Sequence, residues 1–260
     1  MITVMLLAHL LGDYIFQWGV IARWKSQSLS GVLAHGCIVT LSALACTGLT
    51  APAWWPYALL IGLSHTAIDV VRARLIHTTS TRWELVGLLL DQGIHVLIIV
   101  ALVALTGDPL AGRTALAPGL SGARHVLSYA PAAARPQPST PLSPLADPRL
   151  LRYVVGYLLL AQPAWVLIRF LVRGLWGADA APPLDHGEKF GPMVERMAIA
   201  TFTCSGMVLL TPLVLLPRRL MRVTVSPGQA DLAFAMPQHW AETFISIALA
   251  VGIGLVLRGS

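Results

Sequence analysis

The chain has 260 residues, of which 56% are apolar and only 12% are charged, and its formal net charge is +6. A soluble domain carries about 25% charged residues, so this composition, with a mean hydropathy of +0.71, predicts an integral membrane protein. The positive charge does not indicate nucleic-acid binding, because the arginines cluster at the ends of apolar runs, where they orient membrane helices.

Seven apolar runs are long enough to be helices that cross a membrane, since a span needs about 20 mostly apolar residues. In chain order they are 2–20, 31–49, 57–76, 85–106, 150–172, 194–216 and 239–257. The first run lacks a positively charged start and contains His9 and Asp13, so we interpret it as a retained helix rather than a signal peptide. The predicted fold is all-α, a polytopic membrane helical bundle of about seven transmembrane helices.

A stretch rich in proline and alanine divides the chain. Residues 107–149 include YAPAAARPQPSTPLSP, a composition that cannot build a packed core and predicts an irregular loop. We therefore expect a four-helix membrane bundle at 1–106 and a second membrane helical bundle at 150–260.

Basic residues predict how the first bundle is oriented in a cell membrane. The loop after the first run holds Arg23 and Lys25, and the loop after the third holds Arg72 and Arg74, whereas the loop after the second has no charge. Because cytoplasmic loops are enriched in lysine and arginine, we expect the N-terminus outside and the first and third loops in the cytoplasm.

Three histidine–aspartate pairs lie in the apolar runs of the first bundle. They are His9–Asp13, His65–Asp69 and Asp91–His95, each with its members four residues apart. Random placement would give roughly 0.5 such pairs, and residues four apart share one face of a helix. An ionisable residue inside a membrane span is costly and is interpreted as functional by default.

The order within the pairs follows from the predicted orientation. The first and third helices run inward, with histidine before aspartate, and the fourth runs outward, with Asp91 before His95. Antiparallel helices must reverse the order to keep like residues at like depth. At 1.5 Å per residue, the aspartates lie about 10 Å and the histidines about 16 Å from the cytoplasmic ends. His35 falls close to the predicted aspartate layer.

Three carboxylates and four imidazoles at matched depth predict a site for a divalent metal, of a kind that suits zinc, manganese or iron better than calcium. Seven ligands are enough for two ions about 3.5–4 Å apart. The metal ligands are predicted to be His9, Asp13, His35, His65, Asp69, Asp91 and His95, of which Asp13, Asp69 and Asp91 are also the catalytic candidates. In the simpler interpretation, each aspartate only forms a polar clasp with a neighbouring histidine.

Other polar residues are assigned to the surroundings of this site. Predicted to support the ligands are Gln17, Gln92, Glu195 and Arg196, although the last two could instead form an interfacial ion pair. Predicted to attract a phosphate head group at the mouth, besides setting topology, are Arg23, Lys25, Arg72 and Arg74.

These motifs carry a resemblance to a known family. AHLLGDYIFQ, RWKS, LAHG, SHTAID and DQGIH resemble the pattern of the bacterial membrane family of unknown function numbered 3307, over residues 5–95. GPMVERMAIATF through PRRLMR resembles its C-terminal portion more weakly. The family implies no settled activity. The His/Asp spacing is also similar to that of inner-membrane metal-dependent hydrolases, which is an analogy.

The leading hypothesis is a membrane-embedded metalloenzyme that hydrolyses a lipid-linked or phosphorylated substrate, with its site open to the cytoplasmic leaflet. A metal-dependent prenyl or lipid transferase or cyclase is a close variant. Two hypotheses of a different class are a divalent-cation transporter and a non-catalytic membrane scaffold with a structural metal. The expected partner is a membrane lipid or lipid-linked substrate; the oligomeric state is not predicted.

Overall fold

The computed structural model describes residues 1–75, 80–107, 147–177, 190–216 and 237–259. These residues contain helices and no strand, which confirms the all-α fold class. Most of the predicted irregular loop at 107–149, and the PRRLMR segment at 217–222, lie outside the described residues.

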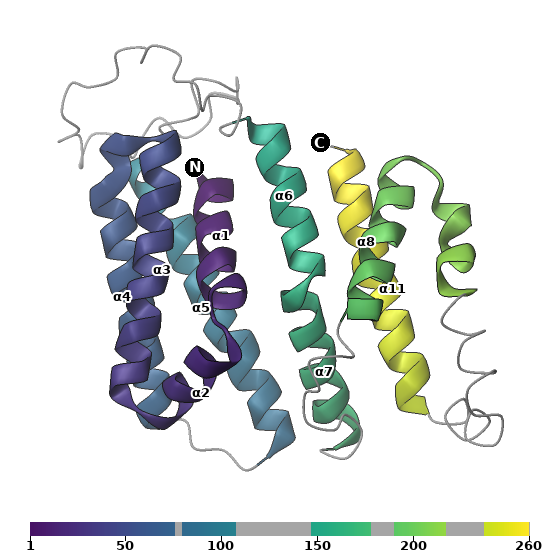
Figure 1. Cartoon of the computed structure of the whole chain (residues 1–260), viewed down its shortest axis with the longest axis horizontal. Helices are drawn as coiled ribbons and strands as arrows, with labels where there is room; N and C mark the ends of the chain where they lie inside the picture. The colour runs from purple at the N-terminus through teal and green to yellow at the C-terminus, as the bar shows by residue number, and fades with distance from the viewer. Residues whose placement is uncertain (76–79, 108–146, 178–189, 217–236, 260) are drawn as a thin grey trace. The chain divides into compact units, whose positions relative to one another are not determined.

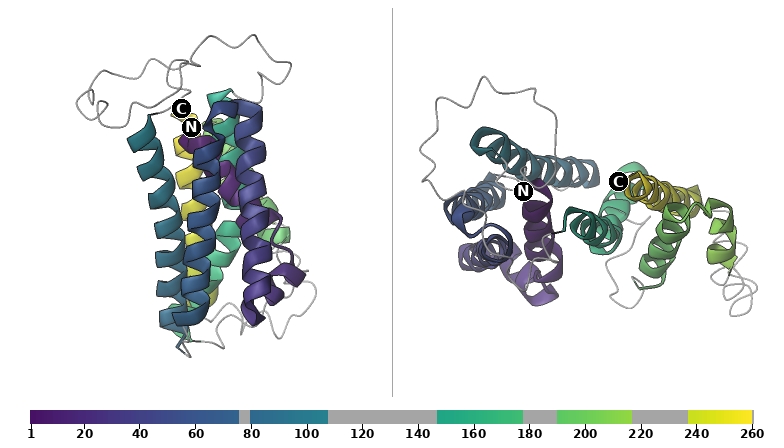
Figure 2. Two further views of the ribbon diagram at one scale, coloured as in Figure 1. Left: turned by 90° about the vertical axis from the view of Figure 1, so that its left-hand side faces the viewer. Right: turned by 90° about the horizontal axis from the view of Figure 1, so that it is seen from above.

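The chain divides into two compact units, Met1–His77 with Leu88–Val155, and Thr78–Gly87 with Gly156–Ser260. The principal helices, in chain order, are α1 (Ile2–Leu10), α2 (Gly19–Gln27), α3 (Leu29–Thr50), α4 (Trp55–Leu75), α5 (Thr81–Thr106), α6 (Pro148–Leu160), α7 (Gln162–Trp176), α8 (Phe190–Cys204) and α11 (Pro237–Arg258). In the first unit, α1, α3, α4 and α5 run side by side (Figure 1), and Figure 2 shows the same arrangement from two further directions.

Within the described residues, four helices are long and apolar enough to cross a membrane, or up to five if the bent pair near the N-terminus counts as one span. They are α3, α5, the α6–α7 pair over Pro148–Trp176, and the last helix from Trp240. The predicted count of about seven is therefore not confirmed. The 21-residue α4 is not among the four; it carries His65, Asp69 and two arginines, which lower its hydropathy.

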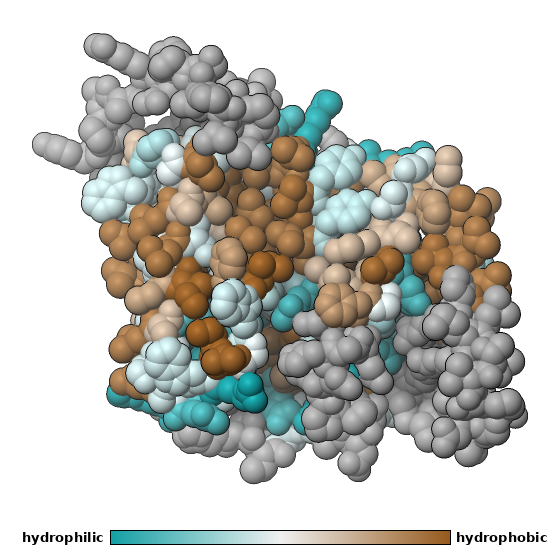
Figure 3. All heavy atoms as spheres, in the orientation of Figure 1, coloured by the Kyte–Doolittle hydropathy of each residue, from teal (hydrophilic) through white to brown (hydrophobic). Residues whose placement is uncertain are grey.

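The first unit buries ionisable side chains beside its apolar core and exposes many large apolar side chains. All of the predicted ligands except Asp13 are among the buried polar residues, whereas large apolar side chains on the same helices are exposed, for example Leu41 at 64% and Leu97 at 64%. Apolar residues, coloured brown, cover much of the face shown in Figure 3. A soluble monomer rarely exposes such continuous apolar surface, so this distribution is compatible with helices surrounded by lipid.

The predicted first span at 2–20 is not one straight helix. After α1 the chain forms one turn of π-helix, η1 (Leu11–Ile15), and α2 then departs at an angle of 86°. A π-turn widens the helix by one residue and is frequent at functional sites. Gly12 lies in this turn with Val39 of α3 so close that an added Cβ would come within 2.8 Å of its side chain. The bend therefore depends on a glycine against α3.

Two glycines let α3 and α4 approach closely. An added Cβ at Gly36 would lie 2.1 Å from Thr66 Oγ1 and 2.8 Å from its methyl group, and one at Gly62 would lie 2.2 Å from Thr40 Oγ1. Each helix thus presents a glycine to a threonine of its neighbour. Small residues at such contacts are typical of helix packing in membranes, and here the contact brings together the two helices that carry His35 and His65.

Gly36→Ala should weaken the α3–α4 contact, because the new methyl group overlaps Thr66. We expect the free energy of unfolding in detergent to fall by about 1–3 kcal/mol. Gly48→Ala, on the same helix with no atom within 4 Å of the added Cβ, is the matched control and should be neutral or stabilising by up to about 1 kcal/mol. Equal responses of the two variants would contradict the packing argument.

Candidate metal centre

The seven predicted ligands gather inside the first unit. His9 comes from α1, Asp13 from η1, His35 from α3, and the remaining pairs from α4 and α5. Their side chains are at most 6% exposed. Five helical segments therefore converge on one buried polar cluster.

The histidine rings form the inner part of the cluster. The ring centroids of His65 and His95 are 4.0 Å apart and stacked, and the His9 ring lies 5.5 Å from the first and 5.4 Å from the second. His35 lies 5.4 Å from His65. Three rings from α1, α4 and α5 thus form a triangle, and the fourth ring adjoins it.

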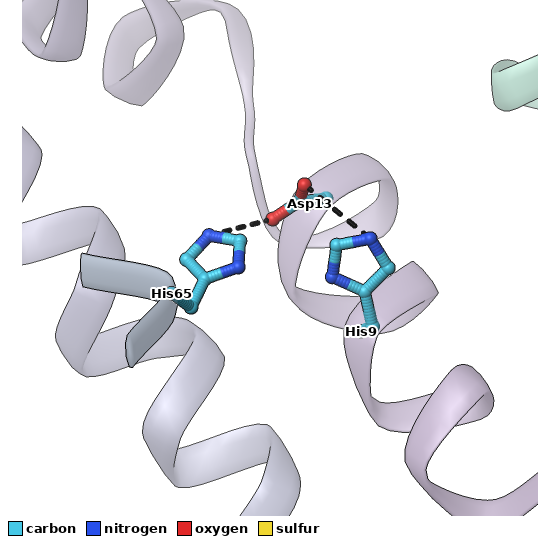
Figure 4. A group of neighbouring side chains, drawn as sticks. All are labelled: His9, Asp13 and His65. Atoms are coloured by element: carbon cyan, nitrogen blue, oxygen red, sulfur yellow. Dashed lines mark ion pairs between the residues drawn. The ribbon is translucent and has the colours of Figure 1, made fainter. Parts of the chain in front are cut away.

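Asp13 is the carboxylate with the most histidine neighbours. Its Oδ1 lies 3.2 Å from the Nε2 atoms of both His35 and His65, and its Oδ2 lies 3.8 Å from Nε2 of His9. Figure 4 shows Asp13 between His9 and His65. The π-turn positions this carboxylate, so a feature of the backbone that the sequence does not reveal determines which histidines it meets.

Gln92 joins the contributions of α1, η1 and α5. Its Nε2 donates to Asp13 Oδ2 and to Asp91 Oδ2, at 3.2 Å each, and its Oε1 lies 3.2 Å from His9 Nε2. One side-chain amide therefore contacts three of the seven predicted ligands. The role predicted for Gln92, supporting residues that bind a metal, stays a prediction.

Two basic residues reach the carboxylates directly. Lys25 Nζ lies 2.7 Å from Asp69 Oδ2, and Arg72 Nη1 donates to Asp91 Oδ2 at 2.7 Å. Arg23 and Arg74 were predicted to act with them, but both are exposed, and Arg23 bonds to the backbone of its own helix at Gly19. Of the four predicted basic residues, Lys25 and Arg72 thus contact the cluster, whereas Arg23 and Arg74 lie on the surface.

Several buried ligand atoms have no hydrogen-bond partner among the described residues. They are both oxygens of Asp69, Asp91 Oδ1, His35 Nδ1 and both ring nitrogens of His95, although Asp69 Oδ2 forms an ion pair with Lys25. An unpaired buried polar atom is unfavourable, so a ligand that satisfies several at once would stabilise the site. Three overlapping groups have ligand atoms all within 4.8 Å of one another: His9–Asp13–His65, His35–His65–Asp69 and Asp69–Asp91–His95.

Gln17 does not lie where the first predicted helix would place it. The helical turns end before it, and it occupies the irregular link between η1 and α2. The support predicted for Gln17 assumed an unbroken helix over 2–20, which would place this residue on the same face as His9 and Asp13, and the structure has no such helix.

Glu195 and Arg196 both lie on α8 in the second unit. The Arg196 side chain is buried and donates to the carbonyl oxygens of Leu160 and Ala161, at 2.9 and 3.2 Å, where α6 passes into α7. These carbonyls lie at a helix break, where the regular hydrogen-bond pattern is interrupted. Arg196 therefore stabilises a broken helix in its own unit, which is a different role from the predicted support of the ligands.

Residues 1–115 match the model of the family described as "Protein of unknown function (DUF3307)". This confirms the resemblance predicted from the N-terminal motifs. The match covers the whole His/Asp cluster and ends before the segments whose weaker resemblance was predicted. No curated protein and no solved structure matches the chain. The similarity to metal-dependent hydrolases stays a prediction.

Gln92→Leu should destabilise the first unit. It removes the amide that contacts His9, Asp13 and Asp91 while leaving these groups buried, so we expect the free energy of unfolding to fall by about 1–3 kcal/mol. Thermal or denaturant unfolding of the purified protein in detergent measures the change. Gln17→Leu in the neighbouring link is the control, with an expected change below about 0.5 kcal/mol. A Gln92 variant as stable as the control would contradict the bridging role.

Proposed function

We propose that the chain is a multi-pass protein of the cell membrane and a divalent-metal-dependent enzyme, which hydrolyses a lipid-linked or phosphorylated substrate. The observation that carries the proposal is the convergence of buried carboxylate and imidazole atoms that lack hydrogen-bond partners among the described residues, at Asp69, Asp91 and His95. Buried polar groups are normally satisfied, and a divalent cation is the ligand that satisfies carboxylate oxygens and imidazole nitrogens together.

The donor set fits zinc, manganese or iron. Zinc accepts nitrogen and carboxylate oxygen in four-coordinate sites, and the mixture of the two donors disfavours calcium. A bound ion would supply Lewis-acid activation of a water molecule. The protein would contribute a neighbouring carboxylate that does not bind the ion, to take the proton from that water. Asp13 is suited to this task, because Gln92 and the histidines already orient it.

The basic residues support a substrate with an anionic head group. Lys25 and Arg72 lie between the buried carboxylates and the surface, with side chains that are 19% and 34% exposed. Arg23 and Arg74 are more exposed on the same helices. The arginine and lysine pattern assigns this side of the first unit to the cytoplasm, so the site would open to the cytoplasmic leaflet. In this proposal α4 also crosses the bilayer, its ionisable residues being shielded by its neighbours, and the full count approaches seven spans.

Asp91→Asn and His95→Ala should each lower the metal content of protein purified in detergent, as measured by elemental mass spectrometry. Loss of a ligand, or of a residue that orients one, typically weakens metal binding at least 10-fold. The same variants should lose phosphate release from phosphatidic acid or a polyprenyl diphosphate, tested with added zinc, manganese or iron. Asp147→Asn alters an exposed aspartate that caps α6 and should leave both measurements unchanged.

The outcomes separate the proposed enzyme from a transporter and from a scaffold. Metal-free protein that stays folded and active would contradict the metal site. Metal binding without phosphate release, together with metal uptake by vesicles that contain the protein, would favour a transporter. Metal binding with neither activity would favour a scaffold.

Exchanging Asp91 and His95 tests whether the geometry of the site matters. The double variant Asp91→His, His95→Asp keeps the composition of α5 but places a carboxylate among the histidine rings and an imidazole beside Arg72. A metal site needs each ligand atom in its place, so we expect the metal content to fall at least as far as in Asp91→Asn or His95→Ala. Retention of metal and thermal stability by the exchanged protein would support the polar clasp instead.

A further inference from the structure

The cluster contains one part that is internally satisfied and one part that is not. Both oxygens of Asp13 have nearby donors, since Oδ1 faces His35 and His65 and Oδ2 accepts from Gln92. In contrast, Oδ1 of Asp69, Oδ1 of Asp91 and both nitrogens of His95 have no hydrogen-bond partner within the described part of the chain. Apart from His35 Nδ1, the unmet ligand atoms therefore belong to Asp69, Asp91 and His95.

Asp69 and Asp91 share one pattern. Each uses Oδ2 for a cation, Lys25 in the first case and Arg72 in the second, at 2.7 Å. Each leaves Oδ1 without a hydrogen-bond partner in the described residues, and a ligand atom of each lies within 4.8 Å of one on His95. Carboxylates that bind metal are commonly held by hydrogen bonds to their other oxygen. Lys25 and Arg72 thus orient the two carboxylates and leave one oxygen of each for an ion.

The charges of the buried cluster leave room for one divalent ion. Asp13, Asp69 and Asp91 carry three negative charges when ionised, and Lys25 and Arg72 offset two of them. With neutral imidazoles, the form that binds metal, the remainder is one negative charge. One divalent ion changes this to one positive charge, which a single anionic group balances. A second ion would raise it to three positive charges in a site where unbalanced charge is strongly unfavourable.

We propose that the centre binds a single divalent ion at Asp69, Asp91 and His95, and that Lys25 and Arg72 take the place of a second metal ion. This inference rests on the proposed function and deepens it, because the seven ligands alone would permit two ions. In this arrangement Asp13, His9, His35 and Gln92 form a hydrogen-bonded support beside the ion. Lys25 and Arg72 are positioning residues, which act through the carboxylates.

The stoichiometry of metal binding tests the proposal. The purified full-length protein is stripped with a chelator, reloaded with excess zinc and desalted, and the zinc per chain is measured by elemental mass spectrometry with amino-acid analysis. We expect one ion per chain for the wild type. In the double variant Lys25→Met, Arg72→Met, the carboxylates lose their cations, so we expect the content to rise to two.

The matched control is Arg23→Met, Arg74→Met. It removes the same charge from the same two helices, α2 and α4, but from exposed positions, and it should keep one ion. Two ions in the wild type would overturn the inference while leaving the proposed metal site intact, whereas no ion in any of these proteins would overturn the proposed function. A folded Lys25/Arg72 variant that still holds one ion would also overturn the inference. If that variant does not fold, the wild-type stoichiometry alone decides.

Discussion

The first unit depends on how three carboxylates are accommodated inside an apolar helical bundle. Asp13, Asp69 and Asp91 are nearly inaccessible to solvent, where an isolated charge is strongly unfavourable. Each carboxylate has different hydrogen-bond or ion-pair partners. Asp13 contacts histidines and Gln92, Asp69 contacts Lys25 and histidines, and Asp91 contacts Arg72 and Gln92. The helices that carry these partners must therefore approach one another at one depth.

The backbone makes that approach possible in two places. Gly36 and Gly62 allow α3 and α4 to pack against each other's threonines, which brings Nε2 of His35 within 3.3 Å of Nε2 of His65. The π-turn and the 86° bend after it end the first helix beside the cluster. Because α2 leaves α1 there, it can return Lys25 to Asp69, which a straight continuation of α1 could not do at the same depth. The bend after α1 and the ion pair between Lys25 and Asp69 are thus linked.

The spacing of the pairs was sufficient to predict which side chains meet, but not how. Residues four apart share a helix face, and the reversed order at Asp91 and His95 indicated antiparallel helices at matched depth. Gln17 lies off the predicted face because the helix over 2–20 is interrupted by a π-turn, which has no distinct signal in an apolar sequence. The prediction also treated Lys25 and Arg72 like Arg23 and Arg74, since topology and ion pairing both use basic residues at helix ends. Their partners depend on tertiary contacts between α2, α4 and α5, which spacing along one helix does not contain.

In our proposal the two interpretations of the pairs, a metal site and a polar clasp, apply to different parts of one cluster. Asp13 shows what a clasp requires, since its oxygens lie near donors from three other helices. His95 shows the opposite condition, with both nitrogens buried and without a hydrogen-bond partner in the described residues, although its ring is stacked on His65. A bundle selected only for packing would gain stability from an apolar residue at position 95, because replacing an unsatisfied polar group by an apolar one removes its desolvation cost. The histidine at that position, close to the carboxylates of Asp69 and Asp91, therefore supports the metal ligand that we propose rather than a role in packing alone.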